Sequence, residues 1–324
     1  MARYQTPSVK RAVWQLVTTL LPLIGAFALM YWSLRVSYWL TLALALPTAG
    51  LAIRTFIIMH DCGHGSFLPS RLGNDIVGWI TGILTAVPYS HWRREHAIHH
   101  ATSGHLDERG TGDISTLTVR EYLALGRWGR LRYRLYRNPL VLLGFGPAYL
   151  FVKHRWPSRK FAGKREVLNV FGTNLALAAL ITTLSLLIGF REFLMVWLPI
   201  LLLSGTAGVW LFYVQHQFED AYWRGKEEWD YATAAVMGSS YFRLPRVIQW
   251  FTGNIGFHHV HHLSPRIPNY RLERCHQENP ELQRVTTLTL GRSIRTMRLK
   301  LWDEENGRMI GFRDLRRRRS VASD

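Results

Sequence analysis

Four long apolar stretches without a charged residue constrain the fold of this 324-residue chain more than any other feature. They are residues 12–34, 36–53, 167–190 and 193–218. At about 1.5 Å per residue, a helix of about 20 residues crosses the ~30 Å hydrocarbon layer of a membrane. The second stretch continues past Arg54, whose long side chain can reach the lipid headgroups from near the end of a span. The sequence therefore predicts an all-α integral membrane protein with transmembrane helices at about 12–34, 36–59, 167–190 and 193–216.

The same stretches indicate the domain organisation. The first is too long for the apolar part of a signal peptide, and the second span follows it at once. Two shorter apolar runs, 76–89 and 139–152, contain Gly or Pro, which favours re-entrant or interfacial placement over a pair of buried core helices. We expect one domain over residues 1–324, in which about 60–165 and 217–324 form a helical cap.

The placement of basic residues predicts the side of the membrane on which the cap lies. Lys and Arg together number 16 in residues 60–165 and 18 after residue 218, whereas the two short connections between spans carry only Arg35 and Arg191. Basic residues collect on the cytoplasmic side of membrane proteins. Both termini and the cap are therefore expected in the cytoplasm. This topology accounts for most of the formal net charge of +18, so no nucleic-acid partner is expected.

Three clusters of histidine lie within the predicted cap. They read His-Asp-Cys-Gly-His at 60–64, His-Ala-Ile-His-His at 96–100 and His-His-Val-His-His at 258–262. On a helix, residues three or four positions apart share one face. Because imidazole is the commonest nitrogen ligand and suits iron, copper and zinc, each cluster is predicted to be a metal-binding face. His259 is out of phase with its neighbours and is expected to point away from that face.

The predicted topology places all three clusters on the same side of the membrane, since an even number of spans separates the first from the last. A further histidine, His216, lies at the cytoplasmic end of the fourth span, where ionisable residues are rare and usually functional. The alternative is an interfacial histidine that faces the headgroups. His91, His105, His154 and His276 lack partners at ligand spacing, and we expect them to be solvated or to contact the ligands from outside.

The number of histidines indicates two metal ions rather than one. A catalytic zinc ion uses three protein ligands and a structural one uses four, whereas this chain offers eight or nine. The zinc-protease pattern His-Glu-x-x-His is absent, as is any Cys-x-x-Cys pair, and Glu-x-x-His, which soluble di-iron bundles need on two helices, occurs once, at residues 273–276. A histidine-rich dinuclear site remains. Iron fits the ligand number and type best, although spacing alone leaves other metals open.

These motifs resemble the three histidine boxes of membrane fatty acid desaturases. The first box, His-Asp-Cys-Gly-His, is similar to that of the acyl-lipid (Δ12/ω-6-type) branch, and the likeness extends over about residues 60–270 and the four spans. The resemblance implies a di-iron centre of two Fe²⁺ ions, O2 as the oxidant, and insertion of a cis double bond into a fatty acyl chain of a membrane lipid. It implies the ligand set His60, His64, His96, His99, His100, His216, His258, His261 and His262.

Electrons for such a reaction would come from another protein. The chain has no Cys-rich cluster motif, no Gly-x-Gly-x-x-Gly fingerprint and no His-Pro-Gly-Gly haem signature. An external carrier of the ferredoxin or cytochrome type is therefore expected, and the basic cap could steer it or could equally bind lipid headgroups. Asp61, Asp113 and Asn254 are candidates for hydrogen bonds that orient ligand imidazoles, or else are helix-cap and turn residues.

Two other functions share part of this pattern. A membrane hydroxylase or monooxygenase (alkane, sterol or carotenoid) uses similar boxes, but its second box more often has three residues where this chain has two between His96 and His99. A metal transporter should hold its ligands near the middle of broken spans, whereas none of the four predicted spans has a central histidine. The sequence therefore favours desaturation over both alternatives, while the bond that is oxidised stays open.

Overall fold

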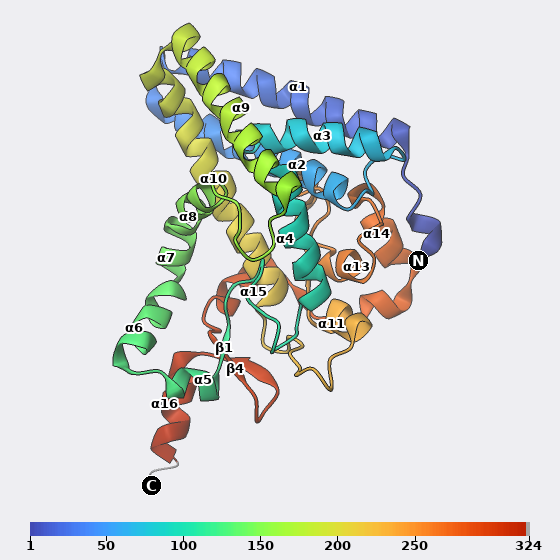
Figure 1. Ribbon diagram of the computed structural model, residues 1–324, viewed down its shortest axis with the longest axis vertical. Coiled ribbons are helices and arrows are strands. Elements are labelled where there is room, and N and C mark those ends of the chain that lie inside the picture. Colours follow the sequence, from blue (N-terminus) through green and yellow to red (C-terminus); the bar gives the residue numbers. More distant parts are fainter. Residues whose placement is uncertain (322–324) are drawn as a thin grey trace.

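The computed structural model describes residues 1–321, which are mainly helical with a few short strands. Its long helices are α1 (Val9–Ser33), α2 (Tyr38–Gly63), α9 (Lys164–Ile188) and α10 (Phe190–His216). All four are long and apolar enough to cross a membrane. They gather at one end of the molecule, and the shorter elements form a cap at the other (Figure 1). The predicted fold class, a mainly helical membrane protein with four candidate spans, is confirmed.

The helix ends differ from the predicted ones by a few residues for local reasons. α1 begins early because Ser8 caps it, with its Oγ accepting a hydrogen bond from the backbone N–H of Arg11 at 3.5 Å. α2 runs on to a turn in which Gly65, at φ +67°, and the next residue donate their backbone N–H groups to the carbonyls of Cys62 and Asp61. Glycine adopts this left-handed conformation without steric cost, so the helix stops directly after its histidine motif.

The cap contains the shorter helices and two small sheets. The helices are α3 (Arg71–Leu84), α4 (Tyr89–Thr102), α5 (Val119–Ala124), α6 (Arg127–Tyr136), α7 (Pro139–Gly144), α8 (Gly146–Lys153), α11 (Tyr231–Met237), α12 (Arg246–Phe251), α13 (His258–Leu263), α14 (Asn269–Glu278), α15 (Leu290–Thr296) and α16 (Phe312–Val321), with 3-10 turns at Ala2–Tyr4 and Pro280–Gln283. The strands are β1 (Leu117–Thr118), β2 (Tyr241–Phe242), β3 (Thr287–Leu288), β4 (Leu301–Asp303) and β5 (Arg308–Ile310). β4 pairs in parallel with β1 and antiparallel with β5, and β2 pairs in parallel with β3. The sheets thereby tie the C-terminal region to segments far earlier in the chain.

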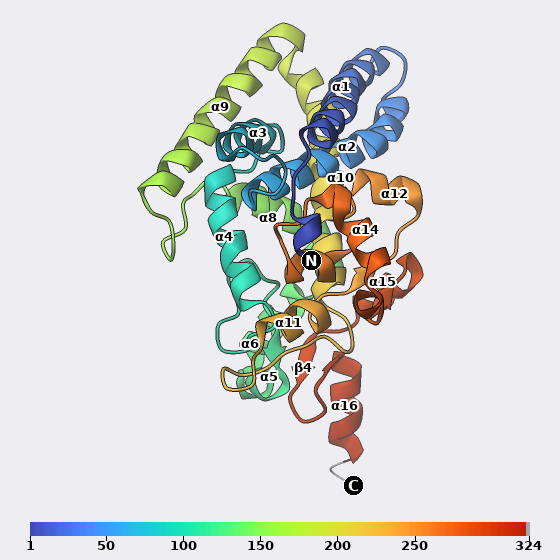
Figure 2. The same ribbon diagram turned by 90° about the vertical axis from the view of Figure 1, so that its right-hand side faces the viewer.

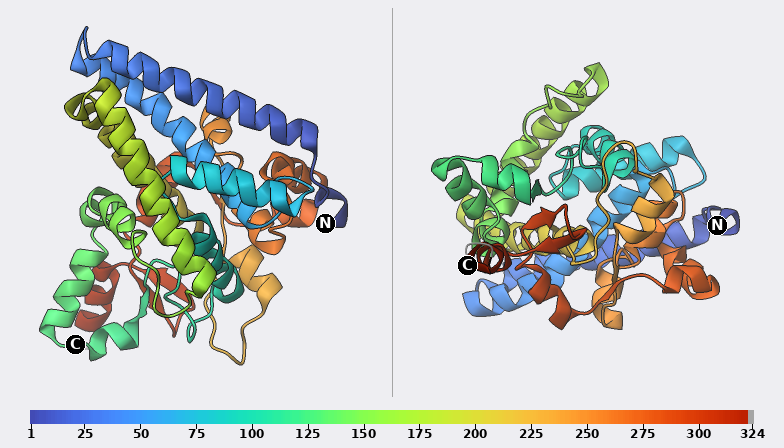
Figure 3. Two further views of the ribbon diagram at one scale, coloured as in Figure 1. Left: turned by 45° about the horizontal axis from the view of Figure 1, so that its top comes forward. Right: turned by 90° about the horizontal axis from the view of Figure 1, so that it is seen from below.

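The two short apolar runs form outward-facing helices. The first lies mostly in α3, which packs beside α2 and separates α9 from α1 (Figures 2 and 3). Leu72 and Ile76 of α3 are exposed. The second run forms α7 and α8, which pack against α10 while Leu140 and Phe145 stay exposed. Helices with one exposed apolar side suit the membrane interface, so these runs agree with interfacial placement and not with buried core helices.

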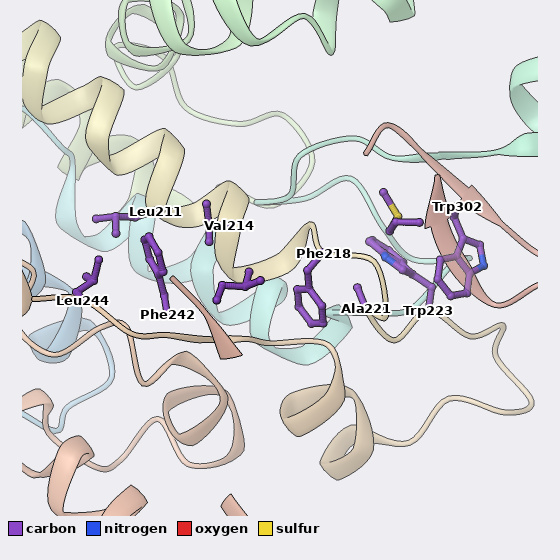
Figure 4. Close-up of a cluster of buried hydrophobic side chains, with 10 residues drawn as sticks. Leu211, Val214, Phe218, Ala221, Trp223, Phe242, Leu244 and Trp302 are labelled. Carbon is purple, nitrogen blue, oxygen red and sulfur yellow. The ribbon is translucent and has the colours of Figure 1, made fainter. Parts of the chain in front are cut away.

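A hydrophobic cluster fixes the end of α10 inside the cap (Figure 4). It joins Leu211 and Val214 of α10 to Phe218, to Phe242 of β2 and to Trp302 of β4. Phe218, Phe242 and Trp302 are each at most 2% exposed. Because a fully buried large apolar side chain stabilises the fold by about 1.5–3 kcal/mol, this cluster gives the last turn of α10 a defined position.

Candidate metal centre

The histidines of the three clusters and His216 come from four helices that meet in the cap: α2, α4, α10 and α13. Their ring nitrogens form two groups, within each of which the atoms lie within 4.8 Å of one another. The first histidine group is His60, His64, His96, His100 and His261, and the second contains His99, His216 and His262. His258 extends the second group, because its Nε2 lies 2.9 Å from Nε2 of His216. The structure therefore brings together all nine histidines predicted as ligands.

Helical spacing explains how the histidines divide between the two groups. Residues four apart on one helix face the same way, so His96 and His100 of α4 both reach the first group. His99 projects from another side of the same helix and reaches the second group. In the short helix α13 the order is reversed. The earlier histidine, His261, belongs to the first group, and the next one, His262, belongs to the second. Each of these two helices thus contributes to both groups.

The distances between Nε2 atoms match those expected around a metal ion. Nε2 of His261 lies 3.0 Å from Nε2 of His60 and 3.0 Å from Nε2 of His100, which in turn lies 3.1 Å from Nε2 of His96. With metal–nitrogen bonds of about 2.1 Å, two ligands at right angles lie about 3.0 Å apart. These three distances therefore fit ligands of one metal ion.

Unpaired nitrogen atoms provide an independent test of whether a metal fits. Nε2 of His64, of His99 and of His262 are all buried and have no hydrogen-bond partner within the described residues. Leaving a buried polar atom without a partner costs about 1–3 kcal/mol. A metal ion would accept these lone pairs, one in the first group and two in the second. The residues of both groups therefore fit a metal ion.

Burial keeps the cap histidines in the form that binds metal. The loss of solvation lowers the pKa of six of the candidate ligands well below 6.5, and the neighbouring histidines lower it further. These six are His64, His96, His100, His258, His261 and His262. At neutral pH their rings are consequently uncharged, and an uncharged imidazole has the free lone pair that a metal requires.

Two carboxylates orient ligand rings from outside, as expected for Asp61 and Asp113. Nδ1 of His60 donates to Oδ1 of Asp61 at 3.0 Å, and Nδ1 of His99 donates to Oδ1 of Asp113 at 2.5 Å. A hydrogen bond at Nδ1 leaves Nε2 as the free acceptor directed toward the group. His216 uses a backbone carbonyl in the same way, because its Nδ1 donates to the carbonyl oxygen of Gly238 at 3.2 Å.

Of the two roles expected for Asn254, the structure shows the turn residue, at φ +59° after α12, and not the orienting hydrogen bond. Its side chain donates to the carbonyl of Asn269 at 3.0 Å and accepts from Gln249 at 2.9 Å, and it contacts no cluster histidine within the described residues. Asn269 is the residue that sequence reasoning missed. Its backbone N–H and its side-chain amide donate to Oδ2 of Asp61 at 2.6 and 2.8 Å. No sequence signal could have revealed it, because 208 residues separate it from Asp61.

Histidines outside the two groups have other partners. Nε2 of His259 lies 3.1 Å from Nδ1 of His276, which confirms that His259 points away from the ligand face of α13. His91 and His105 are buried, so the first of the two alternatives expected for them, a solvated side chain, is wrong. Nε2 of His91 instead accepts a hydrogen bond from the backbone N–H of Ser158 at 3.0 Å.

Replacing Asp113 with alanine is expected to weaken metal binding at the second group. Loss of an outer hydrogen-bond partner of a ligand histidine typically lowers metal affinity by about 10–100-fold. Metal titration of purified Asp113→Ala protein checks this. Asp107→Ala is the matched control, since Asp107 lies in the same loop and accepts a hydrogen bond from Lys226 N–H rather than from a ligand ring. Equal affinities in the two variants would contradict a role for Asp113.

Comparison with known proteins shows similarity across both the spans and the cap. A family profile described as fatty acid desaturase matches residues 36–289. A fatty acid desaturase of Bacillus subtilis (strain 168) is 49% identical over 316 residues, which cover 98% of this chain and 90% of that protein. The sn-1 oleoyl-lipid 12-desaturase of Anabaena variabilis is 29% identical, over 83% of this chain and 77% of its own length. A chloroplastic sn-2 acyl-lipid omega-3 desaturase (ferredoxin) of Arabidopsis thaliana is 31% identical, over 76% of this chain and 55% of its own length.

Proposed function

The chain belongs to the fatty acid desaturase family, and from this premise we propose that it is an O2-dependent di-iron enzyme that inserts a cis double bond into a fatty acyl chain of a membrane lipid. The observation that carries the proposal is the convergence of nine imidazoles into two groups that each fit a metal ion. Family membership indicates the class of reaction, and the two histidine groups are where the metal ions for this reaction would bind. We treat residues 1–324 as a single desaturase domain.

In this proposal each histidine group holds one iron. The first iron would be held by His60, His64, His96, His100 and His261, and the second by His99, His216, His258 and His262. Iron, when bound, activates O2 to an oxidant that can remove hydrogen from an unactivated alkyl carbon, which no acid–base group of the chain could do. Asp61 and Asp113 hold the Nδ1 protons of their histidines, so that the Nε2 atoms stay directed inward.

The stoichiometry requires a supply of electrons. The acyl chain loses two hydrogen atoms as two C–H bonds are replaced by one C=C bond, and O2 is reduced to two molecules of water with two added electrons and two protons. The electrons come from an external carrier of the ferredoxin or cytochrome type. Ferredoxin appears in the name of the Arabidopsis relative, which supports a carrier of this kind.

An acyl chain within a membrane lipid is the proposed substrate. The names of the Anabaena and Arabidopsis relatives specify lipid-bound acyl chains, which supports this class over acyl thioesters. The same names give different positions for the double bond, 12 and omega-3. The first box alone favours the Δ12/ω-6 position. The Lys and Arg residues within 60–165 and after residue 218 favour a location of the cap and both termini in the cytoplasm.

Expression in a host with a simple lipid profile, followed by mass spectrometry of its acyl chains, tests this function. The wild-type chain should introduce a new cis double bond into intact lipids when iron and an electron donor are supplied. The Asp107→Ala variant should do so as well. A hydroxylated product would replace the assignment with the hydroxylase alternative, and iron accumulation without any modified lipid would indicate a transporter. A double bond at a position other than Δ12 would revise only the position.

A further inference from the structure

A buried arginine lies beside the second histidine group, and we propose that Arg137 positions this group for metal binding. The inference rests on the proposed di-iron function, because it concerns the geometry of one of the two metal sites. Arg137 caps the C-terminal end of α6 and is fully buried, at 0% exposure. Among residues 1–321 it forms no ion pair with a carboxylate, although burying a charge costs several kcal/mol.

Nη1 and Nη2 of the guanidinium instead contact five neutral acceptors, whereas Nε is buried without a hydrogen-bond partner within the described residues. Nη1 donates to the carbonyl of Ser115 and to Oγ1 of Thr116, both at 2.9 Å. Nη2 donates to Oε1 of Gln217 at 2.8 Å, and at 3.2 Å to both the hydroxyl of Tyr213 and the carbonyl of Leu299. The donors of a guanidinium form a rigid planar fork, so the five acceptors are held at fixed positions relative to one another.

Four of these five acceptors lie on the two segments that complete the second group, and the carbonyl of Leu299 belongs to a third segment. Ser115 and Thr116 follow Asp113, whose carboxylate orients His99. Gln217 directly follows His216 at the end of α10. Oγ1 of Thr116 also donates to Oε1 of Gln217 at 3.1 Å, which closes a triangle with the arginine. The arginine thus sets the distance between the loop that orients one ligand and the helix end that carries another.

A stabilising role alone does not account for this arrangement. Lys300 lies beside the arginine with its Nζ buried and without a hydrogen-bond partner within the described residues. Burial and the positive charge of Arg137 lower the pKa of Lys300 to about 7. Because Arg137 has no carboxylate partner among residues 1–321 and disfavours the protonated form of Lys300, no ion pair offsets the free energy of burying its charge. What the arginine contributes instead is a fixed geometry of the second histidine group.

Metal content after two graded substitutions tests the proposal. Arg137→Lys keeps the charge but removes the fork, and Thr116→Val removes one acceptor with little change in shape. Purified wild-type protein should hold two iron ions per chain. Arg137→Lys should hold about one, and Thr116→Val should bind its second ion at least about tenfold more weakly. Circular dichroism and melting of the metal-free proteins are measured in parallel, and Thr116→Val is decisive if Arg137→Lys does not fold.

Two further variants show which site is affected. Adding His99→Ala to Arg137→Lys should remove no more iron, whereas adding His64→Ala should remove the remaining ion. Arg155→Lys is the matched control, because the Arg155 guanidinium binds Asn174 and the carbonyl of Ala86 and contacts no cluster histidine. It should keep both ions.

Three results would overturn the inference: wild-type affinity for both ions in Arg137→Lys and Thr116→Val, equal loss from both groups, or the same loss in Arg155→Lys. Failure of the proposed di-iron function is a separate outcome. In that case the wild-type protein itself would not bind two ions.

Discussion

Replacing His261 with alanine is expected to abolish desaturation and to empty the first histidine group of its metal. Nε2 of His261 lies 3.0 Å from Nε2 of both His60 and His100, so the alanine variant loses the ligand between them. Changes to outer partners of ligand histidines already cost about 10–100-fold in affinity or activity. Loss of a ligand should reduce metal affinity and activity by more than this factor, and the new double bond should fall below detection in host lipids. The iron content of the purified protein is measured alongside the product.

His259→Ala provides the matched control for this prediction. His259 lies two residues earlier on the same short helix, is also buried, and faces His276 instead of the metal groups. Its removal leaves His276 without this partner and should lower the free energy of unfolding by about 1–3 kcal/mol while activity and iron content persist. Wild-type activity in His261→Ala would remove that residue from the ligand set. Loss of iron in His259→Ala would show that helical phase does not separate ligands from other histidines.

Acidification of the metal-free protein is expected to destabilise it steeply below about pH 6.5, the ordinary pKa of histidine. Burial lowers the pKa of six cap histidines well below this value in the folded protein: His64, His96, His100, His258, His261 and His262. In the unfolded chain the same histidines bind protons near pH 6.5. The unfolded state therefore binds more protons as pH falls, and the stability present above pH 6.5 is lost. Each histidine contributes up to about 1.4 kcal/mol per pH unit, and six together contribute up to about 8 kcal/mol per pH unit.

Thermal unfolding in detergent between pH 8 and pH 5 measures this effect. The melting temperature of the metal-free protein should be nearly constant from pH 8 to 7 and should fall sharply below pH 6.5. Iron-loaded protein is the control, because a bound metal holds the imidazoles in their neutral form and should shift the fall to lower pH. A melting temperature that does not change between pH 7 and pH 5 would contradict neutral, buried histidines.

Much of the architecture was predictable because its signals are local. Span-length runs without charge predict long apolar helices directly, and the ends of all four candidate spans were predicted to within a few residues. The spacing of His96 and His100 places both on one helix face whatever the rest of the chain does. For the same reason the outward orientation of His259 followed from helical phase alone.

Other features escaped prediction because they depend on contacts between distant segments. Asn254 proved to be a turn residue and not an orienting one, because Gln249 and Asn269 bind its amide. His91 and His105 were expected to be solvated or to contact the ligands from outside, and packing buries both. In the sequence Arg137 is simply one of several cap arginines, and its hydrogen-bond partners lie up to 162 residues away. Burial and long-range hydrogen bonds of this kind leave no periodic trace in a sequence.

Hydropathy and helical phase act over a few turns, so the sequence was enough to predict a helical membrane protein with nine candidate ligand histidines. The division of these histidines into two groups, with His99 and His100 of one helix in different groups, emerged from the packing of the folded chain. Only the tertiary structure revealed that Asn269 supports Asp61 and that Arg137 holds the ends of two segments together. The physical reason is that ligand geometry depends on how α2, α4, α10 and α13 pack, and that packing is set by the whole cap.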